Sequence, residues 1–226
     1  MKITIAQLNS IVGDFAGNFN KIKREFEIAA KNGSELVIFP ELFVTGYPAR
    51  DLLERNEFIK DAIVVNKKIV ALSRKYKSTG IIFGTVTLNK SKYGNPIFNT
   101  AILVHNGKFI FSQNKTCLPK NDVFDEPRYF EPANKINVFK FKNEILGISI
   151  CEDIWTDQGW LDTKYKFSPI KFLAEKGATI LINISASPFY VGKEAIKYNL
   201  LKNHSKKYNI PIIYVNQIGG NDEVIN

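Results

Sequence analysis

A single thiol stands at the end of an apolar run in this sequence, directly before two carboxylates. The run Ile145–Ile150 predicts a strand, and Cys151 follows it at once. Glu152 and Asp153 come next, and burial of such groups costs several kcal/mol unless they are paired. The chain must therefore turn toward solvent or a cleft here, which leaves the Cys151 thiol at the mouth of that cleft.

A second strand end presents a carboxylate in the same way. The residues Leu36–Phe39 predict a strand, and Pro40 and Glu41 follow it. In open α/β sheets, ligands bind outside the carboxyl ends of the strands. Two strand ends with reactive side chains therefore predict one active site at the carboxyl edge of a sheet.

A thiol nucleophile needs a base and benefits from a cation. The sequence has two histidines. His105 ends a predicted strand and His204 lies on a lysine-rich predicted helix, so we interpret both as surface or packing residues, although a Cys–His pair remains formally open. A carboxylate can take the thiol proton and an ammonium favours the thiolate, which makes Glu41 and Lys115 the candidates. Lys115 follows the predicted strand Phe109–Gln113; taken alone, its pattern favours a surface lysine.

The sequence gives little support to a metal site or a disulfide. Cys117 and Cys151 are far apart and lack C-x-x-C spacing, so no structural metal is predicted. Cys117 precedes Leu118 and Pro119, which supply no acid or base, and we interpret it as a small packing residue. The two cysteines could form one disulfide, but nothing else suggests secretion, and we expect reduced thiols in a cytoplasmic protein.

Composition indicates one globular domain. The chain has 226 residues, of which 45% are hydrophobic and 23% charged. Its net charge of +9 invites a nucleic-acid interpretation, but the lysines are scattered and no nucleic-acid motif accompanies them. We expect a solvated basic surface, or one that faces an acidic partner domain. No apolar stretch approaches the roughly 20 residues of a membrane span, and Met1–Ala6 is too short and strand-like for a signal peptide. Neither a nucleic acid nor a membrane is expected as a partner.

Short β-branched runs alternate with longer amphipathic segments, which predicts an α/β domain with helices over the faces of its sheets. The expected strands are Ile3–Leu8, Leu36–Phe39, Gly80–Leu88, Thr100–His105, Phe109–Gln113, Ile145–Ile150, Thr179–Ile184 and Ile212–Asn216. The expected helices are Asn18–Lys31, Asn56–Tyr76, Pro169–Lys176 and Gly192–Tyr208. Asn106-Gly107 predicts a tight hairpin turn. The segment Gly219–Asn226 contains no terminating element, so we expect the chain to stop short of its natural fold boundary.

Three motifs resemble the Glu-Lys-Cys triad of the nitrilase (carbon–nitrogen hydrolase) superfamily. They are Phe39-Pro40-Glu41-Leu42, Lys115 ahead of Leu118-Pro119, and Ser149-Ile150-Cys151-Glu152-Asp153. Four longer segments are similar to the glutaminase domains of glutamine-dependent NAD synthetases, at residues 45–53, 123–130, 185–189 and 215–222. Together the motifs span nearly the whole chain.

The resemblance implies a glutamine amidohydrolase. Cys151 would attack the side-chain amide carbon of L-glutamine, with Glu41 as general base. Lys115 and a backbone N–H just after Cys151 would stabilise the oxyanion. Ammonia leaves, and water activated by Glu41 then hydrolyses the γ-glutamyl thioester. This chemistry requires no metal or cofactor in the domain.

The resemblance also implies substrate-binding residues. Tyr47 would lie at the pocket, and Glu126 would accept the α-ammonium of glutamine. Trp155 would pack on the substrate stem, while Ser187 and Lys193 would meet the α-amino-acid end. Alternatively, Tyr47 and Trp155 are core aromatics and Lys193 is a solvated residue at a helix start.

The implied fold is a four-layer α-β-β-α sandwich over residues 1–226, ending before the last strands that such a domain normally has. The domain would supply ammonia to an ATP- and Mg-dependent synthetase domain that amidates nicotinic acid adenine dinucleotide. The Ser-Gly-Gly-x-Asp-Ser loop of that synthetase domain is absent from this sequence. A homo-oligomer is also implied. Family members usually carry a tyrosine where Asn121 stands, so one aromatic wall of the pocket is expected to differ.

Two other functions remain open. A stand-alone amidase or nitrilase of the same superfamily would act on another small amide or a nitrile, and a panel of such substrates would separate it from a glutaminase. A catalytically idle domain would dock a synthetase and regulate it. The three intact triad positions argue against an idle domain, and a Cys151 no more reactive toward thiol labels than Cys117 would argue for one.

Overall fold

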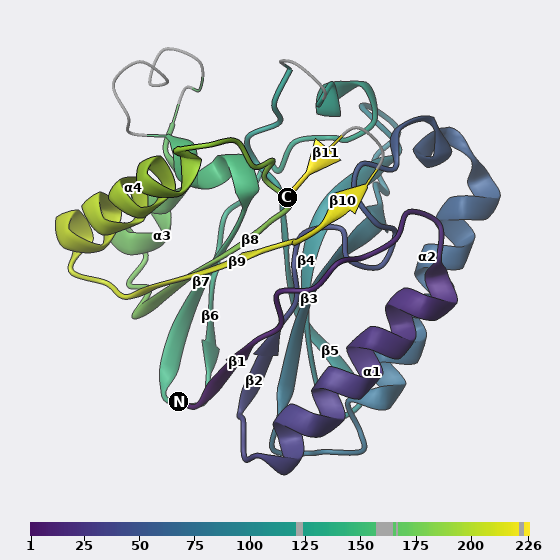
Figure 1. Ribbon diagram of the computed structural model, residues 1–226, viewed down its shortest axis with the longest axis horizontal. Helices are drawn as coiled ribbons and strands as arrows, with labels where there is room; N and C mark the ends of the chain where they lie inside the picture. The colour runs from purple at the N-terminus through teal and green to yellow at the C-terminus, as the bar shows by residue number, and fades with distance from the viewer. Residues whose placement is uncertain (121–123, 157–164, 166, 222–223) are drawn as a thin grey trace.

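Two main β-sheets face each other and carry helices on their outer faces (Figure 1). The computed structural model describes residues 1–120, 124–156, 165, 167–221 and 224–226. In these residues one sheet has the strand order β1-β2-β3-β4-β5 and the other β6-β7-β8-β9. Helices α1 and α2 cover the first sheet, and α3 and α4 cover the second. The predicted α-β-β-α sandwich is therefore confirmed.

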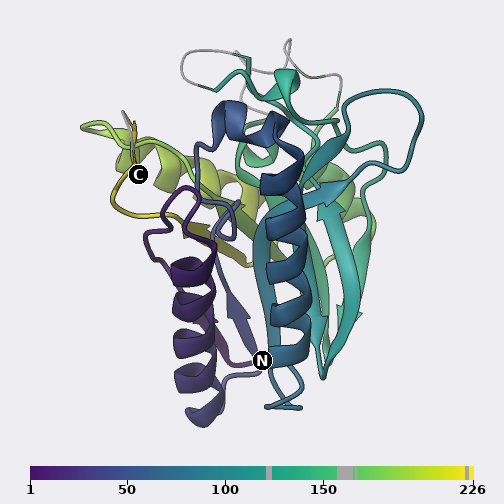
Figure 2. The same ribbon diagram turned by 90° about the vertical axis from the view of Figure 1, so that its right-hand side faces the viewer.

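The first part of the chain builds the first sheet and its two helices. Its elements are β1 (Ile3–Ile5), α1 (Phe15–Lys31), β2 (Leu36–Ile38), the short 3-10 helix η1 (Arg50–Glu54), α2 (Asn56–Leu72), β3 (Gly80–Leu88), β4 (Ile97–His105) and β5 (Lys108–Asn114). Strands β1, β2 and β3 are parallel, whereas β4 and β5 continue the sheet in antiparallel pairs. Figure 2 shows α1 and α2 side by side in front of this sheet.

The second part builds the other sheet. Its elements are η2 (Glu126–Arg128), β6 (Val138–Phe141), β7 (Glu144–Ile150), η3 (Cys151–Trp155), α3 (Pro169–Glu175), β8 (Ile180–Ser185), α4 (Lys193–Tyr208), β9 (Ile212–Asn216) and the small pair β10 (Gly220–Asn221) and β11 (Val224–Ile225). Strands β7, β8 and β9 are parallel, and β6 pairs with β7 in the antiparallel direction. None of the described helices is long and apolar enough to span a membrane.

The predicted elements are confirmed, with β3 and β9 matching at both ends and the others shifted at their boundaries. Asn106 and Gly107 both have positive φ, 49° and 73°, as the predicted hairpin turn requires. Strand β6 was not predicted, because four residues that include Lys140 give too short an alternating pattern. Helix α2 ends at Leu72, so the prediction of helix to Tyr76 was wrong by one turn.

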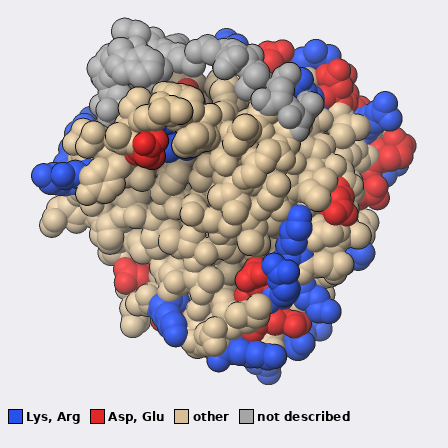
Figure 3. Space-filling view, in the orientation of Figure 1, with Lys and Arg blue, Asp and Glu red and all other residues tan. Residues whose placement is uncertain are grey.

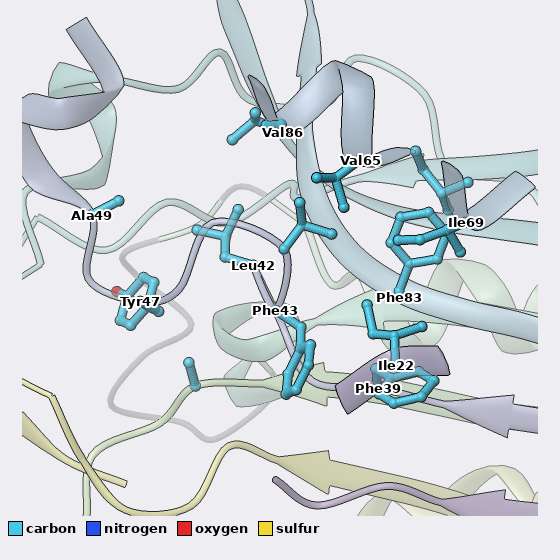
Figure 4. Packing of buried hydrophobic residues seen from close by; sticks show 14 of the residues in the cluster. Ile22, Phe39, Leu42, Phe43, Tyr47, Ala49, Val65, Ile69, Phe83 and Val86 are labelled. Atoms are coloured by element: carbon cyan, nitrogen blue, oxygen red, sulfur yellow. The ribbon is translucent and has the colours of Figure 1, made fainter. Parts of the chain in front are cut away.

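Alternating side chains of the strands feed separate hydrophobic layers. Leu36 and Ile38 of β2 lie between the two sheets, where they meet Ile148 and Ile182 of the second sheet. Val37 points the other way, into the cluster under α1 and α2. Figure 4 shows that outer cluster: Phe39, on the segment after β2, lies close to Ile22 and Phe83, while Tyr47 lies farther along the same segment beside Ala49. Successive side chains of a strand point to opposite faces of the sheet. Because both faces of this sheet are covered, consecutive residues of β2 are apolar.

Charged side chains lie mainly around the rim of the face in Figure 3, where Lys and Arg are interleaved with Asp and Glu. The centre of this face is broadly uncharged. This view therefore shows mixed charge rather than one continuous basic patch, in keeping with the scattered lysines of the sequence.

Gly84 of β3 lies against the turn that carries Glu41. Gly84 N donates to Pro40 O at 3.1 Å, and Val44 N donates to Gly84 O at 3.2 Å. A Cβ at residue 84 would lie 2.2 Å from Leu42 N and 2.6 Å from Glu41 Cα. The backbone of the turn can approach β3 this closely only because residue 84 has no side chain.

We expect Gly84→Ala to lower the free energy of unfolding by about 1–3 kcal/mol, because the added methyl must push the backbone of the turn away. Urea denaturation measures the change. Gly220→Ala is the matched control, since a Cβ there meets nothing within 4 Å. Equal effects of the two substitutions would contradict the close approach at Gly84.

Candidate active site

The Glu41 side chain is fully buried just after β2 and is held by both sheets. Its Oε1 accepts hydrogen bonds from Lys115 Nζ at 2.8 Å and Asn99 Nδ2 at 2.7 Å. Its Oε2 accepts one from the backbone N–H of Ala186 at 2.9 Å, directly after β8 of the second sheet. These donors compensate the loss of water around the carboxylate.

Lys115 follows β5 and is 1% exposed, so the alternative of a surface lysine is wrong. Its Nζ lies 2.8 Å from Glu41 Oε1 and 2.8 Å from Glu126 Oε1. Burial by itself would lower the pKa of Lys115, but the two carboxylates outweigh it and raise that pKa well above its usual value. The side chain is therefore an ammonium ion held between two acids.

Glu126, on η2, is the third charged group of this cluster and is 2% exposed. Its Oε1 also accepts a hydrogen bond from Tyr47 OH at 2.9 Å. Its Oε2 has no hydrogen-bond partner among the described residues. Burial raises the pKa of Glu126 to about 7, against the opposing effect of Lys115. Tyr47 therefore lies in the site, although it is also packed in the outer hydrophobic cluster as a core aromatic.

Cys151 is the first residue of η3, where β7 ends, and its side chain is buried. Its φ is +44°, a left-handed conformation that costs of order 1–3 kcal/mol for a residue other than glycine. Burial and then the Glu41 carboxylate raise the pKa of the thiol, while Lys115 acts in the opposite direction. The resting thiol is therefore protonated at neutral pH and needs a base before it can act as a nucleophile.

Two lysines in the first turns of α4 interact electrostatically with Cys151. Lys193 is half-buried, and burial lowers its pKa while the charge of a Cys151 thiolate would raise it. Lys197, one turn later, is also half-buried, and burial followed by Lys193 lowers its pKa to about 8. Lys197 Nζ lies 3.4 Å from the backbone oxygen of Ser187, which is itself buried. The first turns of α4 thus place two lysine ammonium groups where they interact electrostatically with the thiol.

Trp155 is the last residue of η3. Its half-buried ring packs against the hydrophobic cluster under α3 and α4, with Ile154 and Leu173. Asn121 lies outside the described residues, so its expected effect on the pocket stays a prediction. The substrate contacts predicted for Trp155, Ser187 and Lys193 also stay predictions.

The two histidines and Cys117 have packing roles. His204 is buried and its Nε2 lies 2.8 Å from Ile154 O, while the His105 ring meets Phe141 edge to face. Both cysteines are free, and burial raises the pKa of the Cys117 thiol. Within the described part of the chain, no three His, Cys, Asp or Glu side chains are grouped to hold a metal ion.

Sequence reasoning missed Asn99 and Lys197. Asn99 is fully buried in the middle of β4 and donates to Glu41, but one amide within an apolar strand is a weak signal. Lys197 follows Lys193 by four residues on a predicted helix, which places the two on the same face. That spacing was the one available signal for Lys197.

The comparisons with known proteins agree on one family. The carbon–nitrogen hydrolase family profile matches residues 2–226. Glutamine-dependent NAD(+) synthetase of Synechocystis sp. is 37% identical over 99% of this chain and 40% of its own length. The Thermotoga maritima protein of the same name is 33% identical over 100% of this chain and 37% of its own length. The chain thus spans about two fifths of the length of these relatives.

Solved structures agree with this result. Glutamine-dependent NAD+ synthetase from Acinetobacter baumannii superposes with a TM-score of 0.85 at 31% identity, over 99% of this chain and 39% of that one. An amidase from Nesterenkonia sp. superposes with a TM-score of 0.83 over 100% of this chain and 79% of that one, and its 18% identity shows the shared fold alone. From the family profile, the relatives and the common fold, the chain belongs to the carbon–nitrogen hydrolase family.

Proposed function

We propose that this chain hydrolyses the side-chain amide of L-glutamine and supplies the ammonia to a synthetase domain for NAD synthesis. The observation that carries the proposal is the buried cluster of Glu41, Lys115 and Glu126 beside the Cys151 thiol. The specific substrate is supported by the relatives named glutamine-dependent NAD(+) synthetase, which align with nearly the whole chain. The larger remaining part of those relatives supports a synthetase domain as the partner.

In the first proposed step, the Cys151 thiol loses its proton to Glu41 while the sulfur attacks the amide carbon. Glu41 Oε2 accepts one hydrogen bond among the described residues and so keeps a lone pair for this proton. The electrons of the carbonyl double bond move onto its oxygen. The Lys115 ammonium has three N–H donors, of which Glu41 and Glu126 take two, and the third stabilises this oxyanion.

In the second step, the oxyanion re-forms the carbonyl and the C–N bond breaks. Glu41 returns the proton to the departing nitrogen, so ammonia leaves and a γ-glutamyl thioester remains on Cys151. Water then gives a proton to Glu41 and attacks the thioester carbon. Glutamate departs as the C–S bond breaks, and the thiol recovers its proton. All of these transfers use side chains of this chain, and the proposal includes no cofactor.

The surroundings of Cys151 suit an amino-acid amide. The ammonium groups of Lys193 and Lys197 supply positive charge for the α-carboxylate of the substrate. Glu126 Oε2 is a buried acceptor without a partner among the described residues and can receive substrate N–H groups. A stand-alone amidase acting on an uncharged small amide would not need the two lysines.

Cys151→Ala should abolish glutamine hydrolysis and glutamine-driven NAD formation, because no other group can form the thioester. Ammonia-driven NAD formation by the intact protein should be unchanged. Cys117→Ala is the control, since it removes the other free thiol and leaves Cys151, Glu41 and Lys115 in place, and both activities should persist. Equal loss of glutamine-driven and ammonia-driven activity would contradict the proposal. Faster hydrolysis of other small amides than of glutamine would instead favour the stand-alone amidase.

The ionisation of Glu126 predicts a dependence of stability on pH. Its pKa in the folded protein, about 7, lies above the ordinary value of 4.5, so folding retains a proton on this carboxyl between those values. Its contribution to the free energy of unfolding therefore falls as the pH rises from 4.5 to about 7 and is level above. Glu126→Gln stays neutral and should gain stability relative to the parent protein over this range.

Urea denaturation at about pH 5 and about pH 8 measures that difference. The comparison between the two proteins cancels the titration of all other groups. Glu175→Gln is the control, because Glu175 is exposed and lies away from the buried cluster. A stability difference between Glu126→Gln and the parent protein that stays constant with pH would contradict the raised pKa.

A further inference from the structure

Asp153 lies two residues after Cys151 and its carboxylate is buried, with 1% of the residue exposed. Its Oδ2 accepts a hydrogen bond from Ile150 N at 3.0 Å. Its Oδ1 accepts two more, from Thr116 N at 3.0 Å and Cys117 N at 2.7 Å. One side chain therefore binds the backbone just before Cys151 and the backbone just after Lys115.

The two backbone segments belong to different sheets. Lys115 follows β5 of the first sheet, whereas Cys151 follows β7 of the second. Hydrogen bonds to an ionised acceptor are shorter and roughly twice as strong as neutral ones. The Asp153 carboxylate is therefore a strong link between the sheets directly beside the reactive groups.

The backbone of Cys151 needs such a link. A left-handed φ at a residue with a side chain persists only where the surroundings determine it. Ile150 N is fixed by Asp153 on one side, and on the other side Asn183 Nδ2 of β8 lies 3.5 Å from Cys151 O. The strained residue is thus held at both ends.

We propose that Asp153 is a positioning residue, which fixes the Cys151 sulfur relative to the Lys115 ammonium. The inference rests on the proposed roles of Cys151 and Lys115. It goes beyond the formation of a turn, because a turn needs only the bond to Ile150 N. The two hydrogen bonds from Thr116 and Cys117 are not part of that turn. They fix the distance between the end of β5 and the end of β7.

The charge state of Asp153 fits this role. Burial raises its pKa to about 6, while the backbone hydrogen bonds from Cys117 and Ile150 hold it down. The side chain is therefore ionised at neutral pH and acts only as an acceptor toward all three N–H groups.

Asp153→Asn tests the proposal because an amide keeps the shape but has one acceptor oxygen. In either orientation its NH₂ group faces a backbone N–H, so the link to one strand end is lost. We expect kcat for glutamine hydrolysis by the intact protein to fall by about 10²-fold, the cost of a displacement of about 1 Å. KM should change by less than about 3-fold, since no substrate contact is removed.

Asp14→Asn is the matched control. Asp14 Oδ1 also accepts a backbone hydrogen bond, from Gly17 N at 2.8 Å, but at the start of α1 and away from the cluster. The kcat of the Asp14→Asn variant should equal that of the parent protein. If Asp153→Asn does not fold, Asp153→Glu keeps the charge but moves the carboxylate by one methylene, and kcat should fall by at least about 10-fold.

The rate of Cys151 alkylation by iodoacetamide, followed by peptide mass spectrometry, separates positioning from general loosening. Asp153→Asn should slow the reaction by about 10-fold when Lys115 is present and by less than about 2-fold in a Lys115→Gln background. If Asp153→Asn lowered the alkylation rate by the same factor in both backgrounds, the proposal would be overturned. Asp153 would then act on Cys151 independently of Lys115.

Other results also test whether Asp153 is a positioning residue. Parent-level kcat in Asp153→Asn, or failure of both Asp153 variants to fold, would overturn the inference. If Cys151→Ala still hydrolysed glutamine, the proposed function itself would fail. If Cys151 is essential and Asp153→Asn is fully active, only the inference fails, so the two failures are distinguishable.

Discussion

The ammonium of Lys115, sealed from water between Glu41 and Glu126, is the interaction on which the site depends. Charges removed from water are tolerated only when they are paired and hydrogen-bonded. The chain must therefore bring the ends of β2 and β5 and the short helix η2 to one point. Loss of Lys115 would leave the two buried acids without their cation. The same pairing fixes the Lys115 ammonium, whose third N–H the proposed reaction uses.

The packing of the two sheets sets the geometry of this cluster. Glu41 comes from the first sheet, and its carboxylate accepts from Ala186 N of the second. In the second link the acceptor comes from the second sheet: the Asp153 carboxylate, in the turn after β7, accepts from backbone N–H groups in the segment after Lys115. The hydrophobic layer between the sheets holds both links in register. The geometry of the candidate site therefore depends on the packing of the core.

The protonated state of the Cys151 thiol means that the proposed reaction requires an adjacent base. The pKa of Cys151 is raised by burial and by the negative charge of Glu41, so the free site holds little thiolate. In the proposed reaction, this thiol gains its reactivity when a proton moves to Glu41 during attack. The half-buried Lys193 and Lys197 add positive charge near the thiol. We infer that an anionic substrate group both binds there and completes the charge balance of the site.

The sequence by itself determined the alternation of strands and helices, the residue types at the strand ends, and the assignment of Glu41, Lys115 and Cys151 to one edge. Those features follow from local periodicity and short motifs. It did not determine that Lys115 is buried or that Glu126 is its second partner.

Only the tertiary structure decided these points, because Glu41 and Lys115 are 74 residues apart and meet through the packing of whole elements. The bridging contacts of Asp153, which local sequence assigns to a turn, were decided in the same way.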